Sequence, residues 1–249
     1  PKFKKNIAYT RRGKKTGSIL QQWDSKTQNW YKYHKYAWEY SKKGHLLKRI
    51  NYKWNKETQE WEKSNMEKFA YDATGNKTLK TSYQWEKTGN SWKESQKYAY
   101  KYDSDGRLIE KTSYYIQTYG ENKGEWVRRR KNQYTYTNKG NKKEVIRFRV
   151  NYKTKKWEPR QKQNYTYDAS GKNTEQIIYN TGQKEDWKAT RKNIFTYYPD
   201  NPKLILPFVE KDDGEGFEPD FDEGRPRTMQ TFTKYSSEQW EPKGTMRFI

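Results

Sequence analysis

The segment Tyr71-Asp72-Ala73-Thr74-Gly75-Asn76 has the composition of a tight turn. An aspartate at this place accepts hydrogen bonds from nearby backbone N–H groups, and a glycine takes the left-handed conformation that other residues avoid. The same chemistry returns at residues 102–106 and 167–171. The segment therefore predicts a turn that recurs along the chain.

Residues on both sides of this turn alternate with a period of two. Upstream, Phe69 and Tyr71 are separated by one residue, and downstream Thr81, Tyr83 and Trp85 alternate with polar residues. Period-two alternation of aromatic and β-branched residues predicts half-buried antiparallel strands. Since every second residue is polar, we expect one solvated face and one face that carries columns of aromatic side chains.

The turn belongs to a repeat of about 31 residues. Its glycine recurs with spacings of 31 or 34 residues, and a tyrosine precedes each glycine by four positions. Pairs of tryptophans such as Trp54 and Trp61 flank six residues each, and we expect them to pack face to edge across a hairpin. The glycines of the column are Gly13, Gly44, Gly75, Gly106, Gly140 and Gly171.

These patterns predict an all-β fold, an antiparallel β-meander of about seven two-stranded repeats. We expect an elongated, coiled open sheet, and a barrel-like closure is the alternative. Six to seven repeats occupy residues 1–200. Residues 201–249 hold an interrupted last repeat, with an acidic, Pro- and Gly-rich insert at 207–226 and capping strands after it.

Composition gives the charge of the chain and excludes some classes of protein. The formal net charge is +22; residues 200–223 contribute −7, so the remaining chain carries +29. There are no cysteines and no apolar run of membrane-spanning length, so we expect no membrane insertion. The chain begins at Pro1 without a methionine, and we expect a signal peptide to have been removed from a secreted, periplasmic or outer-surface protein.

With these residues in view, the chain resembles the tyrosine–aspartate (YD-type) β-hairpin repeat proteins secreted by Bacteroidetes. The matching features are Tyr71-Asp72-x-x-Gly75-Asn76 and the hairpin Tyr83-x-Trp85-x6-Trp92, and the resemblance covers residues 3–200. It implies an envelope or extracellular location and an adhesin role. No catalytic or binding residues carry over from it. The chain departs from the motif where Thr10, Ser41 and Thr137 replace the aspartate.

Aromatic residues near the open end are the candidates for a ligand surface, because sugar rings stack on their faces. They are Trp23, Trp30, Tyr31 and Tyr33. Tyr31 and Tyr33 are expected on the face opposite Trp30, where other copies carry Glu, Lys, Val or Arg. The alternative is that such residues simply form the core. The favoured function is a non-enzymatic, adhesin-like interaction protein that binds a glycan or a surface protein.

A basic cluster gives the second function, salt-dependent binding of acidic polysaccharide or nucleic acid. It consists of Arg128, Arg129, Arg130 and Lys131, with Arg147 and Arg149 on the next strand. The alternative is a solvated face that keeps the sheet soluble. No DNA or RNA recognition motif is present, which argues against sequence-specific nucleic acid binding.

Signals for catalysis are weak. His34 is expected in a strand and His45 just after a turn, and neither accompanies a nucleophile motif. We predict no enzyme activity, no catalytic residues, no cofactor and no resident metal; a glycan-active enzyme using paired carboxylates is a further alternative. The acidic insert offers oxygen ligands for Ca²⁺ without the spacing of an EF-hand, and charge compensation is the alternative reading.

Overall fold

The computed structural model describes residues 2–118, 123–181, 186–197, 228–234 and 239–247. The secondary structure of these residues consists of strands joined by turns. The strands are β1 (Phe3–Tyr9), β2 (Lys15–Asp24), β3 (Asn29–Tyr40), β4 (Leu46–Asn55), β5 (Glu60–Tyr71), β6 (Lys77–Glu86), β7 (Ser91–Tyr102), β8 (Leu108–Ile116), β9 (Trp126–Tyr136), β10 (Lys142–Val150), β11 (Trp157–Tyr167), β12 (Asn173–Thr181), β13 (Trp187–Thr196), β14 (Thr228–Thr233) and β15 (Glu241–Arg247).

The strands form one sheet in which each strand neighbours the strands before and after it in sequence, from β1 to β15. In the part of the chain that the structure describes, β1 pairs with β2 alone and β15 with β14 alone. The predicted all-β antiparallel meander is confirmed. The barrel-like alternative is wrong, because the strand order keeps two unpaired ends.

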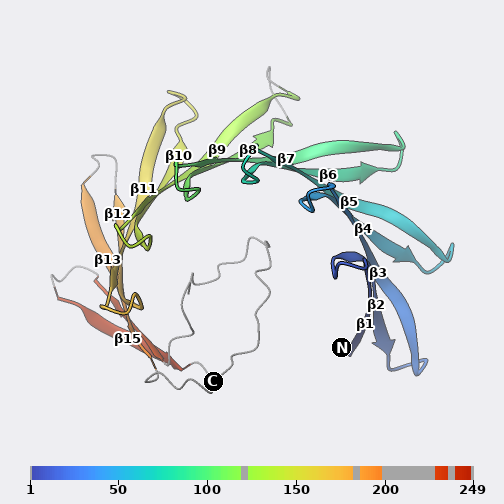
Figure 1. The fold of residues 1–249 in the computed structure, drawn as a ribbon, viewed down its shortest axis with the longest axis horizontal. Helices are drawn as coiled ribbons and strands as arrows, with labels where there is room; N and C mark the ends of the chain where they lie inside the picture. The colour runs from blue at the N-terminus through green and yellow to red at the C-terminus, as the bar shows by residue number, and fades with distance from the viewer. Residues whose placement is uncertain (1, 119–122, 182–185, 198–227, 235–238, 248–249) are drawn as a thin grey trace. The chain divides into compact units, whose positions relative to one another are not determined.

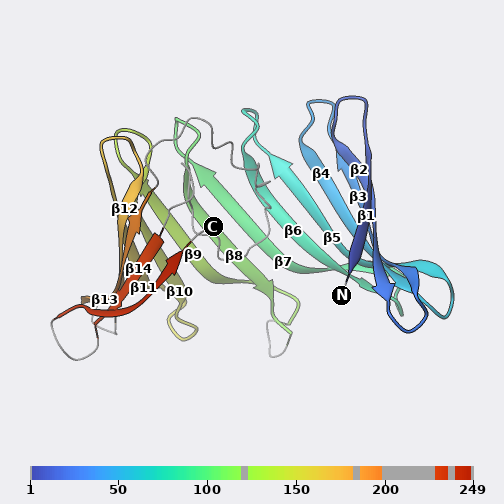
Figure 2. The same cartoon turned by 90° about the horizontal axis from the view of Figure 1, so that it is seen from below.

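The chain divides into two compact units, unit 1 (residues 1–131) and unit 2 (residues 132–249). In unit 1 the connections alternate between the two opposite ends of the strands (Figure 1). Short glycine turns join β1 to β2, β3 to β4, β5 to β6 and β7 to β8, and we call this the turn edge. Tryptophan-flanked loops, one residue shorter than the glycine turns, join β2 to β3, β4 to β5 and β6 to β7, and we call this the hairpin edge (Figure 2).

A β-bulge lies beside each turn of unit 1 and changes which residues share a face. Glu39 pairs with Lys48, yet Tyr40 pairs with Leu46, so one extra residue stands in β4. Because side chains alternate along a strand, one inserted residue moves the following side chains to the other face. The sequence pattern around Gly44 carries no mark of this insertion.

The predicted single aromatic face is therefore wrong. Cross-strand partners point to the same side of a sheet. Trp38 pairs with Arg49, whereas Ile50, the next residue along, pairs with Ala37 and points the other way. We call the two sides of unit 1 the tyrosine face, which carries Tyr40, Phe69, Tyr71, Tyr100 and Tyr102, and the tryptophan face, which carries Tyr52, Trp54, Trp61, Tyr83, Trp85 and Trp92.

The midpoints of the strands are the best-buried parts of unit 1. Met66 and Thr81 on the tryptophan face are 4% and 6% exposed, and Lys80 and Tyr98 on the tyrosine face are 7% exposed each. Lys80 is buried with its charge compensated, because its Nζ lies 2.9 Å from Glu67 Oε1. Glu67 also pairs with Arg49 at 2.5 Å. Aromatic rings and paired charges thus fill the middle of the sheet.

The repeated tyrosine links each turn to the one before it. The Tyr71 hydroxyl donates a hydrogen bond of 2.9 Å to the Leu46 carbonyl, and Tyr102 does the same to Lys77 at 2.9 Å. In unit 2, Tyr197 donates to Asn173 at 2.8 Å, and burial raises the pKa of Tyr197 to about 12. The tyrosine column therefore holds neighbouring repeats together.

In the first two repeats the residue after the turn glycine reaches the other way, toward the next turn. Lys14 Nζ donates to the Gly44 carbonyl, and the ring of His45 lies 4.7 Å from that of Tyr71. A Cβ added to Gly75 would lie 2.9 Å from His45 Cε1, at a φ of +95°. The predicted left-handed glycine is confirmed here, and its lack of a side chain also makes room for the preceding repeat.

Unit 2 has the same hairpin pattern with a more amide-rich interior. Gln163 is 3% exposed, and its side-chain NH₂ donates to Gln161 at 2.9 Å while Tyr165 donates to Gln163 at 2.8 Å. Asn193 donates to Gln176 at 2.8 Å. Residues 198–227, which include the predicted acidic insert, lie outside the described residues. The domain division near residue 200 therefore stays a prediction.

Candidate functional site

The hairpin edge of unit 1 presents three tryptophan pairs in a row. Each pair joins directly opposed residues at the end of a hairpin and packs edge to face, as the sequence predicts. The ring centroids lie 5.4 Å apart in the first pair and 5.0 Å apart in the other two, with interplanar angles of 64°, 68° and 67°. In chain order the pairs are Trp23–Trp30, Trp54–Trp61 and Trp85–Trp92.

Lysines lie between these pairs and over their rings. Lys32 Nζ is 4.1 Å from the Trp54 ring centroid, and Lys63 Nζ is 4.0 Å from that of Trp85. Lys97 Nζ is 4.4 Å from the Trp126 ring. These distances are those of cation–π contacts. Tryptophans and lysines therefore alternate along the tryptophan face, and we call this row the Trp–Lys ladder: Trp23, Trp30, Lys32, Trp54, Trp61, Lys63, Trp85, Trp92, Lys97 and Trp126.

The ladder lysines are unlike those of the tyrosine face. In the described part of the chain, Lys32, Lys63 and Lys97 form no ion pair, and each lies over an aromatic ring. Lys80, by contrast, is buried against a carboxylate. An ammonium over a ring keeps its full charge, so the ladder stays electropositive toward solvent. Sequence reasoning missed these lysines because their partners depend on the bulged register.

Two of the four predicted ligand-binding aromatics line one open depression at the first hairpin. The depression has a volume of about 580 Å³ and includes Trp23 and Tyr31. Lys56 Nζ lies 3.7 Å from the Tyr31 ring centroid and approaches it from the next hairpin. The full lining is Lys2, Gln22, Trp23, Asp24, Ser25, Lys26, Tyr31 and Lys56, which is basic overall.

The other two predicted aromatics lie outside that lining. Tyr33 is the extra residue of a bulge in β3, because Gln21 pairs with Lys32 and Leu20 with His34. Its ring contacts Tyr31 at 6.4 Å and Phe3 at 6.1 Å. Trp30 is 37% exposed on the tryptophan face. The four predicted residues are therefore split between the two faces, with Tyr31 opposite Trp30 as expected.

The predicted basic cluster falls in both units, so each part is described separately. In unit 1, Arg128, Arg129 and Arg130 are exposed on β9, and Lys131 is half-buried. Successive strand residues alternate between faces, so these four cannot form one flat patch. In unit 2, Arg147 donates from Nη1 to Gln161 Oε1 at 2.8 Å, and Arg149 pairs in register with Glu158. The Arg147 side chain is thus part of the hydrogen-bond network within unit 2.

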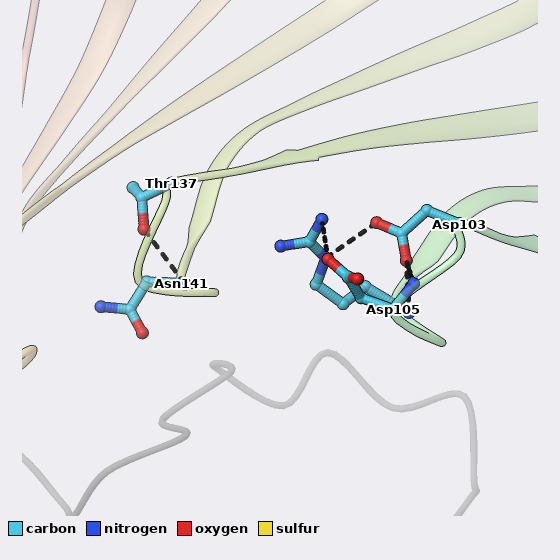
Figure 3. Close-up of polar contacts among 5 residues, drawn as sticks. Asp103, Asp105, Thr137 and Asn141 are labelled. Atoms are coloured by element: carbon cyan, nitrogen blue, oxygen red, sulfur yellow. Dashed lines mark hydrogen bonds and ion pairs between the residues drawn. The ribbon is translucent and has the colours of Figure 1, made fainter.

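The aspartates of the glycine turns bond within their own turns. The Thr74 hydroxyl and the Asn76 N–H donate to Asp72 Oδ1 at 2.7 and 2.8 Å, and the Thr74 bond is the main cause that lowers the Asp72 pKa. Asp103 accepts from the Arg107 N–H at 2.8 Å. Figure 3 shows this turn and the Thr137 turn of unit 2, in which the Asn141 N–H donates to the Thr137 hydroxyl at 3.2 Å.

A depression of about 590 Å³ lies between the two aspartate turns of unit 1 and contains Asp72, Asp103 and Asp105. Their carboxylates already accept bonds from Thr74, Asn76 and Arg107, or pair with Arg107 at 2.7 and 2.9 Å. Among the described residues no group of three or more His, Asp and Glu side chains could hold a metal ion. The turn depression is a product of turn packing.

The two histidines also lie in structural contacts. His34 Nδ1 is 3.2 Å from Asn51 Oδ1, and its ring stacks on Tyr36 at 6.1 Å. His45 packs against the ring of Tyr71 in the next turn. Neither contact contains the nucleophile, base and orienting group that hydrolytic catalysis uses. The proposed calcium ligands of the acidic insert lie outside the described residues.

Comparison with solved structures finds similarity to proteins of Bacteroides. A protein of unknown function from Bacteroides fragilis is 19% identical, with a TM-score of 0.45 over 53% of this chain and 91% of that one. A DUF3836 family protein from Bacteroides vulgatus is 14% identical, with a TM-score of 0.33 over 37% of this chain and 89% of that one. A porin-like protein from Bacteroides uniformis is 10% identical, with a TM-score of 0.43 over 96% and 85%.

Fold and site together define an all-β, hairpin-repeat protein with an aromatic and basic edge. No family model and no curated protein matches the chain, so the resemblance to YD-type repeats stays a prediction. The solved structures above give neither an activity nor a ligand. The described residues contain no helix that is long and apolar enough to cross a membrane.

Proposed function

We propose that the protein is a non-enzymatic, adhesin-like interaction protein of the cell envelope or the extracellular space. It holds a glycan against the hairpin edge of unit 1. The observation that carries this proposal is the row of tryptophan pairs, which repeats in three consecutive hairpins. Such a row presents wide aromatic surface at regular intervals, which is the surface on which sugar rings stack.

The open depression adjoins the end of this row at Trp23 and extends around the hairpin tip to Tyr31 on the opposite face. Tyr31 stands where other copies carry charged residues or valine, and the lysine over its ring leaves the rest of the depression open to solvent. An aromatic ring can stack on a sugar, and the ammonium groups beside it can donate hydrogen bonds to the sugar hydroxyls. Tyr31 is therefore the residue of this end that we expect to contact ligand.

A glycan array with the intact chain tests the proposal, at low and at high salt. We expect glycan binding that weakens about tenfold in Tyr31→Ala, in the range found for interface aromatics. Tyr152→Ala is the matched control, because Tyr152 is 58% exposed and belongs to unit 2. The proposal fails if no glycan binds at either salt concentration, and capture of a surface protein instead would assign the edge to a protein partner.

The exposed arginines of β9 favour a second candidate, the binding of a polyanion such as an acidic polysaccharide or nucleic acid. Arg128, Arg129 and Arg130 are consecutive and exposed, which suits phosphate or sulfate neutralisation. The triple change to glutamine should then abolish binding that is itself lost at high salt. If that triple variant binds polyanions like the unchanged chain, β9 is a solvated strand.

A further inference from the structure

The Trp–Lys ladder combines regularly spaced tryptophan pairs with regularly spaced lysines, and stacking of sugars on aromatic rings alone would not require the lysines. Lys32 and Lys63 occupy the same position in two consecutive repeats, and each reaches the tryptophan pair of the following hairpin at 4.1 and 4.0 Å. Neither lysine has a carboxylate partner within the described chain. An unneutralised ammonium thus alternates with each aromatic step in this part of the row.

The spacing of the steps is fixed by the sheet. Successive tryptophan pairs are one hairpin apart, which is two strand separations or about 9–10 Å. Two linked pyranose rings have about this length. A polysaccharide that lies across the strands would therefore bring every second sugar to an equivalent place, beside a tryptophan pair and a lysine.

Charge decides which polysaccharide fits. A chain with a carboxylate or sulfate on every second sugar would offer one anion to each ladder lysine. A neutral chain would use the rings alone. We infer that the Trp–Lys ladder of unit 1 is a binding track for an acidic polysaccharide, laid across the strands with one disaccharide to each hairpin. The inference rests on the proposed glycan-binding function and names its ligand class.

One position in the row breaks the pattern and makes the inference testable. In the third hairpin Glu94 stands where Lys32 and Lys63 stand in the first two. Glu94 Oε1 accepts a hydrogen bond of 3.2 Å from the Tyr83 hydroxyl on the same face. A carboxylate at this step would repel an acidic chain, while Lys97 resumes the row beyond it. The track should be weakest at the third hairpin.

The probes are hyaluronan oligosaccharides of four to ten sugars, which carry a carboxylate on every second sugar, and the same oligosaccharides with their carboxylates reduced to alcohols. We expect calorimetry on the intact chain to show tighter binding of the acidic series, increasing with each added disaccharide. Lys63→Gln should weaken it about two- to fivefold, as expected for one exposed ion pair. Glu94→Lys should strengthen it by a similar factor, and this gain cannot come from misfolding.

Lys53→Gln is the matched control. Lys53 is exposed and precedes Trp54, yet it pairs in register with His34 and so lies on the tyrosine face. Its loss changes the net charge equally and should leave the affinity unchanged. Equal effects of Lys53→Gln and Lys63→Gln would reduce the result to net charge and overturn the track.

The outcomes separate this inference from the function on which it rests. Equal binding of the acidic and the reduced series, with no gain in Glu94→Lys, overturns the acidic track but leaves glycan binding intact. Binding of neither series, together with a blank glycan array, overturns the proposed function itself. An affinity that does not increase with the length of the oligosaccharide restricts the ligand to a single depression and also overturns the track.

Discussion

The two edges of unit 1 use aromatic and basic residues in different ways. At the turn edge, Tyr71 bonds to the preceding repeat and His45 packs on the following one. At the hairpin edge, the tryptophans pair within their own hairpins, and lysines such as Lys63 lie over a ring and form no ion pair with any described residue. Repetition at the turn edge thus maintains the stack of repeats, and repetition at the hairpin edge leaves a surface available to a ligand.

The largest effect that would test this contrast is expected from Gly75→Ala. The new Cβ would meet His45 and force a positive φ of +95° on alanine, so we expect a loss of about 2–3 kcal/mol in the free energy of unfolding. Gly13→Ala is the control, because its φ is +77° and no atom lies within 4 Å of the added Cβ. Urea denaturation measures both. Equal losses would show that backbone conformation alone matters and that the packing of His45 does not.

A lysine on each face sharpens the comparison. Lys80→Gln removes a buried partner of Glu67, and we expect it to cost about 2 kcal/mol, since Arg49 remains to pair with that carboxylate. Lys63→Gln should change stability by less than about 0.5 kcal/mol, because its side chain is exposed. Thermal unfolding of the two variants decides the matter. A similar loss in both would make the ladder lysines part of the fold.

The tyrosine column provides a smaller effect with an internal control. Tyr71→Phe deletes the hydroxyl that donates to Leu46, and about 1 kcal/mol of stability should be lost. Tyr9 belongs to the same column in the first copy, is 54% exposed, and has no preceding described turn to which it could bond. Tyr9→Phe should therefore leave the free energy of unfolding unchanged in the same denaturation experiment. A loss in both variants would contradict the repeat-to-repeat role of the hydroxyl.

Low pH should destabilise the turn edge by protonating Asp72. Hydrogen bonds from the Thr74 hydroxyl and the Asn76 N–H lower its pKa in the folded state. The stabilisation is complete above the unfolded-state pKa of about 3.9 and is lost as the pH falls below that value toward the folded-state pKa. Denaturation midpoints at pH 6 and pH 3 should differ less in Asp72→Asn than in the unchanged chain. An unchanged pH dependence would show that other carboxylates govern acid unfolding.

Much of the fold could be predicted from the repeat length, the alternation of residues along the strands and the positions of the turn glycines. The glycine column marks the turns, the alternation marks the strands, and the six-residue separation of Trp54 from Trp61 marks a hairpin. These features work because each depends on residues close in sequence. The prediction of one aromatic face failed because a bulge adds a single residue beside the turn, with no compositional sign, and that residue inverts the faces.

The candidate site was predicted only in part for the same reason. Tyr31 and Trp23 could be recognised as aromatics of the open end, and the structure places both in one depression. The partners of Lys32 and Lys63 lie 22 residues further along the chain, across a strand pairing that the bulges set. A pattern search confined to single repeats therefore counts these lysines as ordinary surface charge.

The bond from each turn tyrosine ends on a backbone carbonyl, and this has a consequence for how such chains change over generations. A carbonyl is present whatever residue carries it: the acceptors are leucine, lysine and asparagine in three different repeats. Loss of a whole copy by recombination, for instance residues 47–77, would bring Tyr102 to the Leu46 carbonyl that Tyr71 now uses. The tyrosine hydroxyl needs no particular side chain as its acceptor. The number of copies can therefore vary while the hydrogen bond between neighbouring repeats is kept.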